Sequence, residues 1–233
     1  MYRNPDAAKI VDTAAALRER IGERFPGASL SKVAEEPVVT CGQAPTTAAW
    51  LARPNLPLRV AVAVLLLVLV GILAGALASL RIEAGFANLS DLFQGLEAAV
   101  NDFVFVGLAV FFLLTIETRL KRRRALLAIH ELRSLAHVID MHQLTKDPAR
   151  LMSGGPDTAA SPQRTMSSFE LTRYLDYCSE LLAVISKTAA LHVQPFQDPV
   201  TMAAVDQVES LVAGLSHKIW QKIMILDRPR SAP

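Results

Sequence analysis

The sequence predicts an all-α membrane protein: a hairpin of two transmembrane helices that carries a cytoplasmic helical bundle and an N-terminal amphipathic helix. Three observations predict this class: an uncharged apolar run at residues 60–80, a second apolar run at residues 98–116, and helical spacing of apolar residues over much of the remaining chain. The composition agrees, because 52% of the 233 residues are hydrophobic and the mean hydropathy is +0.31.

The first apolar run has no charged residue between Arg59 and Arg81. Its 21 residues, 60–80, extend for about 30 Å at 1.5 Å per residue, which is the thickness of the hydrocarbon core of a bilayer. We therefore expect a transmembrane helix over residues 58–80.

Small residues recur at every fourth position near the end of this first helix. Such a ridge lets a neighbouring helix approach closely, and the neighbour is either the second membrane helix or a second copy of the chain. We therefore treat the ridge as a candidate site of self-association in the membrane. Its residues are Gly71, Gly75 and Ser79.

The second apolar run is shorter than the first. Only 14 residues, 103–116, lie between Asp102 and Glu117, fewer than the roughly 17 that a transmembrane helix needs. Both carboxylates can lie at the membrane surfaces, and a helix over residues 98–120 supplies the missing length. We expect this helix to cross the membrane, and the alternative is a buried core helix.

Five basic residues follow the second apolar run within six positions. The stretch from Arg81 to Asp102 holds one basic residue against four acidic ones, so the positive-inside rule places both termini in the cytoplasm and the loop at residues 81–97 outside. The basic residues account for the topology and are suited to contact anionic lipids. They are Arg119, Lys121, Arg122, Arg123 and Arg124.

The location that we expect is the inner membrane of a bacterial cell. Arg outnumbers Lys by 17 to 7, which is typical of GC-rich bacterial genomes. We expect no signal peptide, because the first apolar run begins near residue 60 and has no cleavage-site context. Cys41 and Cys178 both fall on the cytoplasmic side, where we expect free thiols.

The N-terminal region, residues 1–36, is predicted to contain an amphipathic helix. Asn4 and Pro5 are typical of a helix start, an N-cap followed by proline, and apolar residues then recur at helical spacing from Ile10 to Phe25. The narrow apolar stripe packs either on another protein helix or on a lipid surface. The mixed charges of the polar side favour the protein.

Two stretches rich in proline and glycine are predicted to be linkers. The first contains four prolines and the second contains the Gly154–Gly155 pair. They divide the chain into an N-terminal region at residues 1–36, a linker at 37–57, a transmembrane hairpin at 58–120, and a cytoplasmic domain at 121–233 with a linker at 148–165.

The cytoplasmic domain is predicted to be a bundle of about three helices. The second membrane helix supplies the first of them by continuing to Leu144, either straight or with a kink near the basic residues. The second helix begins at the capping box of Ser167 and Glu170. The third begins at Asp198 and Pro199, an N-cap followed by proline.

The last helix has the most regular apolar repeat of the chain, with alternating steps of three and four that only Lys222 interrupts. Such a seam suits a helical bundle or a coiled coil, and flanking apolar residues favour burial against two neighbours. We also consider it a candidate seam for oligomers. Its residues are Val205, Val208, Val212, Leu215 and Ile219.

The stretch from His130 to Asp147 is the strongest candidate for chemistry, because it holds three of the five histidines. On a helix His130 and His137 share a face, and His137 lies three residues before Asp140. These three side chains could hold a divalent metal ion. The alternative is that they form hydrogen bonds between helices or a surface for a partner.

No catalytic signature occurs in the sequence, which has no phosphate-binding glycine loop, no nucleophile elbow and no alternation of strands and helices. We expect no cofactor. After Arg124 the chain carries 10 Lys and Arg against 11 Asp and Glu, so its charge gives no reason to expect nucleic acid as a partner.

We interpret the chain as a non-catalytic scaffold or signalling subunit that forms homo-oligomers and presents its cytoplasmic bundle to a protein partner. Two other classes remain open. An oligomeric pore-forming effector would use the membrane hairpin, and its pathway would have to come from assembly, because neither membrane helix has an ionisable residue near its centre. A metal-dependent membrane-bound enzyme would use the helix from His130 to Asp147.

Overall fold

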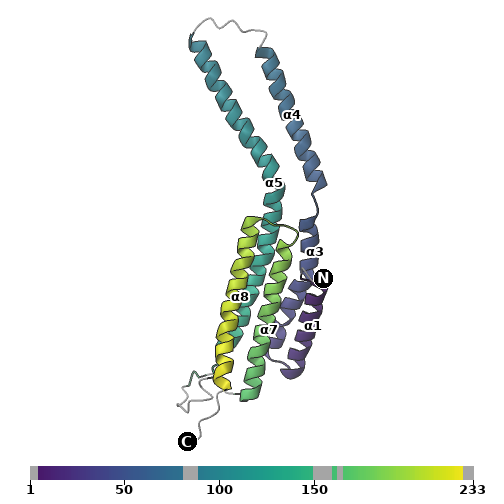
Figure 1. Ribbon diagram of the computed structural model, residues 1–233, viewed down its shortest axis with the longest axis vertical. Coiled ribbons are helices and arrows are strands. Elements are labelled where there is room, and N and C mark those ends of the chain that lie inside the picture. The colour runs from purple at the N-terminus through teal and green to yellow at the C-terminus, as the bar shows by residue number, and fades with distance from the viewer. Residues whose placement is uncertain (1–4, 81–88, 149–158, 162–164, 228–233) are drawn as a thin grey trace. The chain divides into compact units, whose positions relative to one another are not determined.

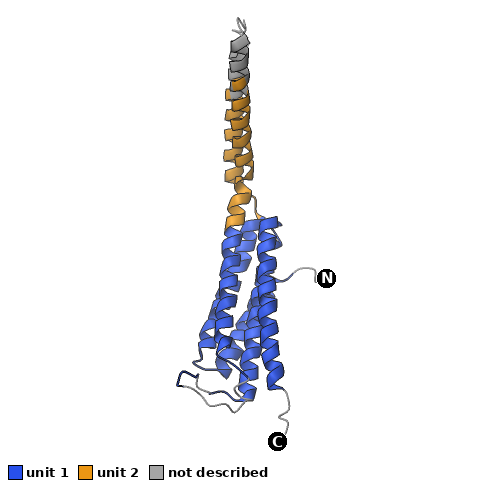
Figure 2. Ribbon diagram, turned by 90° about the vertical axis from the view of Figure 1, so that its left-hand side faces the viewer, with its two compact units in different colours: residues 1–52, 124–233 blue, residues 53–123 orange. Residues whose placement is uncertain are grey.

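The computed structural model is all-helical, which confirms the predicted fold class at that level. The chain divides into two compact units (Figure 2), and we describe each unit by itself. Unit 1 comprises Met1–Ala52 and Arg124–Pro233, and unit 2 comprises Arg53–Arg123. The residues that the structure describes are 5–80, 89–148, 159–161 and 165–227.

Unit 1 is a bundle in which α7 (Ser168–Val193) makes the most extensive contacts. It packs against α8 (Pro199–Leu226), α3 (Glu35–Ala52) and α1 (Ala7–Arg24), and these helices lie side by side in Figure 1. A short helix, α2 (Ser29–Val33), joins α1 to α3. The N-terminal helix is thus part of the same bundle as the C-terminal helices.

The apolar stripe of α1 packs on protein within unit 1, as the mixed charges of its other side favour. Ile10, Ala14, Leu17 and Ile21 are all buried. The predicted start at Asn4 is wrong by two residues, because the side chain of Asp6 caps the helix by accepting from the N–H of Ala8 at 3.0 Å. Asn4 itself lies outside the described residues.

Helix α3 occupies most of the predicted linker at residues 37–57, so that prediction is wrong. The linker prediction failed because most of the prolines lie at positions where a helix tolerates proline. Pro37 lies in the first turn of α3, where backbone N–H groups have no partner within the helix, and Pro54 lies after its end. Pro45 is inside the helix and costs one hydrogen bond, which the burial of side chains such as Ala44 and Leu51 offsets.

The predicted starts of the last two helices are confirmed. Ser167 and Glu170 form a reciprocal capping box at the start of α7: the N–H of Glu170 donates to the Ser167 hydroxyl at 3.2 Å, and the Ser167 N–H donates to the Glu170 carboxylate at 2.8 Å. Asp198 caps α8 and accepts from the N–H of Thr201 at 3.0 Å, with Pro199 in the first turn.

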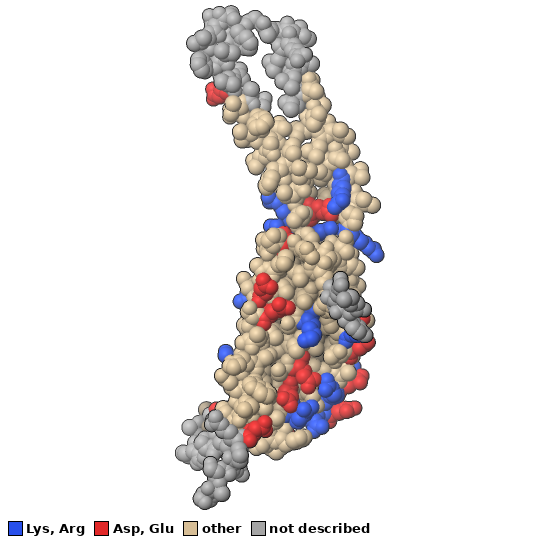
Figure 3. All heavy atoms as spheres, in the orientation of Figure 1, with Lys and Arg blue, Asp and Glu red and all other residues tan. Residues whose placement is uncertain are grey.

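Unit 2 contains α4 (Leu56–Leu80) and the first part of α5 (Leu89–Leu144). By length and composition, two helices among the described residues are suited to cross a membrane, and their most apolar windows contain no buried residue. On the visible face in Figure 3, the middle of unit 2 shows no charged side chain, whereas both signs of charge are scattered over unit 1.

Helix α5 is a single helix of 56 residues. It begins at Leu89 rather than at residue 98, so the second half of the predicted outer loop is helical. Residues 81–88 of that loop lie outside the described part of the chain. The helix continues without interruption to Leu144, where the apolar stripe of the sequence also ends.

Candidate functional site

The structure does not bring the three predicted metal ligands together as a site. His130 and His137 are exposed, and Asp140 is half-buried and accepts a hydrogen bond from the side chain of Gln143 at 2.6 Å. Within the described ranges, no group of three or more His, Cys, Asp or Glu side chains is arranged to hold a metal ion. The polar character of this stretch has another structural use.

A partly buried polar cluster connects the end of α5 to α8. Lys222 of α8 donates from Nζ to the side-chain oxygen of Gln143 at 2.5 Å and to its backbone carbonyl at 2.8 Å. Gln143 is only 1% exposed, and its amide nitrogen donates to Asp140. Every polar atom of the Gln143 side chain therefore has a partner, as a buried amide requires.

The residues around this cluster lie in an apolar environment that disfavours charge. Burial lowers the pKa of Lys222, although the carboxylates of Asp147 and Asp140 oppose this. Burial also raises the pKa of Cys178 to about 12 and that of Tyr174 to about 12. The thiol and the phenol are thus neutral at physiological pH.

Tyr174 adds a third helix to the cluster. Its hydroxyl is 3.5 Å from the backbone carbonyl of His142, and the Lys146 ammonium lies 5.2 Å from the centre of its ring. On its other side the ring packs edge-on against Phe25, with 5.5 Å between the ring centroids. Residues His142 and Gln143 of the stretch are therefore hydrogen-bonded to α7 and α8, whereas Asp140 accepts from Gln143 of its own helix.

Gln143 and Lys222 were not predicted to be partners from the sequence. A signal was present, because Lys222 is the one residue that interrupts the apolar seam of the last helix. In the structure this lysine lies at the position where the seam meets Gln143. A polar residue at a seam position indicates a specific polar partner on the facing helix.

The seam residues themselves are buried in unit 1. Val205, Val208, Val212, Leu215 and Ile219 are each at most 6% exposed and belong to one apolar core with α1, α3, α5 and α7. Of the two uses that the sequence suggested, the structure places them in the chain's own bundle. A second copy could reach them only if the bundle opened.

A second polar site is buried between α3 and α7. The Cys41 thiol and the Thr188 hydroxyl are 2.9 Å apart, and burial raises the pKa of this thiol. One helical turn later, His192 is 1% exposed, and its Nδ1 has no hydrogen-bond partner among the described residues. Burial lowers the pKa of His192 to about 4, so the imidazole is neutral.

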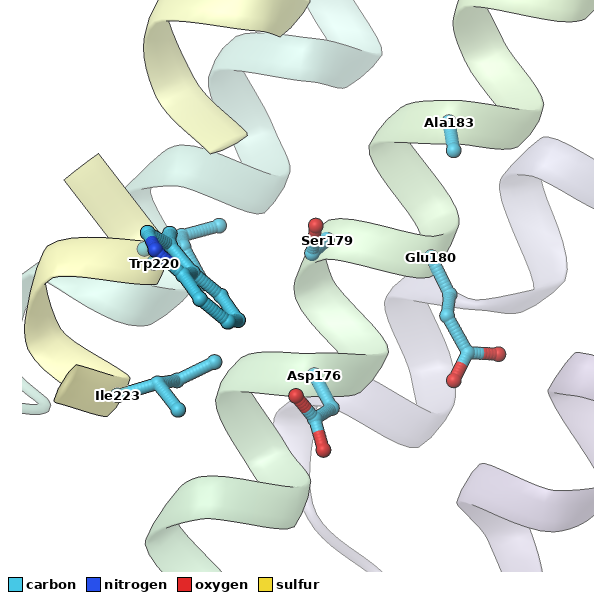
Figure 4. A pocket seen from close by; sticks show the side chains of 7 residues that line it. Asp176, Ser179, Glu180, Ala183, Trp220 and Ile223 are labelled. Atoms are coloured by element: carbon cyan, nitrogen blue, oxygen red, sulfur yellow. The ribbon is translucent and has the colours of Figure 1, made fainter. Parts of the chain in front are cut away.

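An open groove of about 290 Å³ lies between α7 and α8 (Figure 4). Trp220 forms one wall and is 59% exposed, and Ser179 and Ala183 lie across from it. The acidic groups at its edge already have partners, because Asp176 pairs with Arg173 at 3.1 Å and Glu180 pairs with Arg20 at 2.8 Å. The groove can therefore accept an apolar group, and it offers no unpaired carboxylate.

The ridge of small residues in α4 has open space at its two glycines, as far as the described atoms extend. A Cβ atom added at Gly71 or Gly75 would meet no described atom within 4 Å, and both residues are exposed. The side chain of Ser79 lies outside the described part of the structure. The sequence left two partners open for the ridge, the second membrane helix and a second copy of the chain, and no described atom fills the space directly beside these two glycines.

Part of the basic run is bonded inside unit 2. Glu117 accepts from Arg59 at 2.6 Å, and Lys121 lies 3.1 Å from the same carboxylate. Arg122 is half-buried and Arg123 is exposed. One carboxylate thus pairs with two of the cations that flank the apolar segments.

Two arginines of the run stack on aromatic rings. The guanidinium carbon of Arg119 lies 5.2 Å from the ring centre of Phe112 within unit 2. That of Arg124 lies 4.5 Å from the ring centre of Trp50 within unit 1. Both distances are those of cation–π contacts.

Comparison of the chain with protein-family models, with curated proteins and with solved structures finds no match. The function is therefore inferred from the residues and their arrangement alone.

Proposed function

We propose that the chain is a two-pass membrane-anchored scaffold or signalling subunit without catalytic activity of its own. In this proposal both termini are cytoplasmic, the chain self-associates, and unit 1 is presented to a protein partner. The observation that carries the proposal is the course of α5. This one helix runs from the apolar segment after residue 103 to Gln143, where Lys222 binds it to the last helix of the bundle.

The packing of unit 1 gives this course of α5 a mechanical consequence. Leu132 and Ile139 of α5 are fully buried in the same core as Leu182 of α7 and Ile219 of α8. A densely packed core does not deform continuously, so a shift of α5 has to be accompanied by a shift of its neighbours. A displacement of the membrane segment would thus reach the surface of the bundle.

The state of the polar side chains supports a non-catalytic role. Asp140, Gln143 and Lys222 use their hydrogen-bonding groups on one another, and Tyr174 and Cys178 are held neutral by burial. A catalytic acid, base or nucleophile needs access to a substrate and a pKa suited to its task. The buried phenol of Tyr174 and the buried thiol of Cys178 lack both features, and the hydrogen bonds of Gln143 to Lys222 and Asp140 are of the kind that stable packing between helices requires.

Native mass spectrometry of the intact chain released from mild detergent tests the proposal. We expect an oligomer that carries no stoichiometric metal. One metal ion per chain, lost in a His137→Ala variant and retained in a His217→Ala control, would instead support the enzyme. A monomer at every detergent concentration would contradict self-association. Dye leakage from vesicles that contain the purified chain would support the pore-forming alternative.

A further inference from the structure

We propose that the stacked pair of Trp50 and Arg124 binds the phosphate of an anionic phospholipid headgroup. The inference rests on the proposed function in one respect, because it takes the apolar segments of α4 and α5 to lie in a bilayer. It goes further by assigning a lipid-binding role to a specific pair of side chains. In the sequence, the basic run as a whole predicts contact with anionic lipids.

The pair is held in place by its buried neighbours. Leu51, next to Trp50 at the end of α3, is 1% exposed, and Ala125, next to Arg124 in α5, is fully buried. Trp50 is half-buried and Arg124 is exposed. The indole is thus fixed on the surface of unit 1, and the guanidinium that stacks on it faces the surroundings.

The stack leaves the hydrogen-bonding groups of Arg124 available. A guanidinium carries five N–H donors in its own plane, and stacking uses only its face. Among the described residues Arg124 has no carboxylate partner, unlike Arg59 and Lys121, which share Glu117. A planar donor group without an internal anion suits an acceptor that can bind two N–H groups at once, as phosphate does.

The position of the pair in the chain indicates a lipid as the source of that phosphate. Arg124 follows Ile116, the last residue of the uncharged stretch of α5, by eight residues, or about 12 Å of helix. The Cα–Cβ bonds of an α-helix tilt toward its N-terminus, which for Arg124 is the direction of the apolar stretch of the same helix. Trp50 lies six residues before Leu56, where α4 begins.

The apolar side chains beyond the basic run need a cover that a soluble anion cannot provide. Phe111 is 58% exposed and Leu114 is 64% exposed. Lipid tails would cover them, and the headgroups of the same lipids would then lie at the level of the arginines. Indole rings and arginine side chains are both favoured in that layer.

The experiment uses the full chain with the substitution Trp220→Phe. Of the two tryptophans of the chain, this variant retains only Trp50. The protein is reconstituted in vesicles of phosphatidylcholine, with or without phosphatidylglycerol. We expect Trp50 fluorescence to be quenched by lipids brominated near the carbonyl end of the acyl chain and little by lipids brominated near its tip. If both brominated lipids quench Trp50 equally, or if neither lipid quenches it, the proposed position of Trp50 is overturned.

The role of Arg124 is tested with Arg124→Gln and with a matched control, Arg133→Gln, an exposed arginine later in the same helix. We expect Arg124→Gln to weaken retention of phosphatidylglycerol over phosphatidylcholine about fivefold, which corresponds to the roughly 1 kcal/mol of one cation near an anionic surface. The control should retain the preference of the parent protein. Arg124→Lys keeps the charge and loses the planar stack. Its preference for phosphatidylglycerol should lie between that of Arg124→Gln and that of the control.

Two further arms separate the possible failures. If inorganic phosphate alone changes Trp50 fluorescence in phosphatidylcholine vesicles as phosphatidylglycerol does, the ligand is free phosphate and the lipid proposal is overturned. If the protein floats with the vesicles but Arg124→Gln binds lipid like the parent, the inference fails and the membrane anchoring stands. If the protein does not float with vesicles, the anchoring itself fails.

Discussion

The ammonium of Lys222 lies 2.5 Å from the side-chain oxygen of Gln143, a residue 79 positions earlier in the chain and 1% exposed to solvent. This contact joins the end of α5 to α8 at the only position where the apolar seam of α8 is broken. It also accounts for the polar residues near the end of α5, since Asp140 accepts from the same glutamine. The cluster thus identifies which helices pack together.

The contact between Lys222 and Gln143 predicts a coupling between two substitutions. Lys222→Met leaves the buried oxygen of Gln143 without a donor, so we expect it to lower the free energy of unfolding by about 1–3 kcal/mol. Gln143→Leu should be destabilising for the converse reason. The double variant removes both the donor and the side-chain acceptor of this contact, and its loss should be clearly smaller than the sum of the single losses.

Urea unfolding of the four proteins in detergent measures this cycle. The matched control is Lys218→Met combined with Gln143→Leu, because Lys218 lies one turn earlier on α8 and is exposed. For the control pair, the loss in free energy of unfolding of the double variant should equal the sum of the two single losses. Additive losses for the Lys222 pair would show that the hydrogen bond contributes nothing measurable to the fold.

Buried His192 predicts that stability falls at acidic pH. Burial lowers its pKa from 6.5 to about 4, so between these values the unfolded chain binds a proton that the folded chain does not. Stability is therefore fully present above pH 6.5 and is lost as the pH falls toward 4, by about 3 kcal/mol in total. His192→Leu should remove this part of the pH dependence.

The measurement is urea unfolding at several pH values across this window. His130→Leu serves as the control, because its side chain is exposed and it should show the same acid dependence as the parent protein. If His192→Leu loses stability on acidification as steeply as the parent, the dependence comes from other groups, such as the Glu170 carboxylate of the capping box.

Local signals predicted much of this fold. The capping box of Ser167 and Glu170 and the Asp198–Pro199 start depend on residues a few positions apart, so the sequence alone was sufficient to place them. Helix α3 was missed because proline was treated as a breaker irrespective of its position. The spacing of Cys41, Ala44 and Leu51, which together bury one face, was the signal in favour of a helix.

The polar cluster required information that local patterns do not contain. Gln143 and Lys222 are 79 positions apart with α7 between them, and nothing in the spacing of either residue specifies its partner. The metal hypothesis had the same weakness, because His130, His137 and Asp140 share a helix but no second ligand cluster was fixed in space. The structure instead pairs Asp140 with Gln143 on its own helix.

The two cysteines predict slow thiol chemistry. Cys41 and Cys178 are 1% and 0% exposed, and burial raises the pKa of both thiols. Because the thiolate is the reactive form, we expect neither cysteine of the folded chain to react with a disulfide reagent at mildly alkaline pH, and both to react after denaturation. A Ser210→Cys variant, at an exposed position of α8, should react at once. Immediate reaction of the parent protein would mean that unit 1 opens readily.

Gly75→Leu tests self-association in the membrane. An added Cβ atom at Gly75 meets no described atom within 4 Å, so the start of a larger side chain has room there. If a second copy packs on the ridge of Gly71, Gly75 and Ser79, a leucine separates the helices and should weaken the oligomer by at least about tenfold in dissociation constant, or about 1.4 kcal/mol.

Gly107→Leu in α5 is the matched control, since an added Cβ there also meets no described atom within 4 Å. Sizing with light scattering across a detergent dilution series compares the three proteins. An unchanged mass for Gly75→Leu would remove the ridge as the interface, whereas a loss of mass in both variants would indicate a general sensitivity of the membrane helices to bulk.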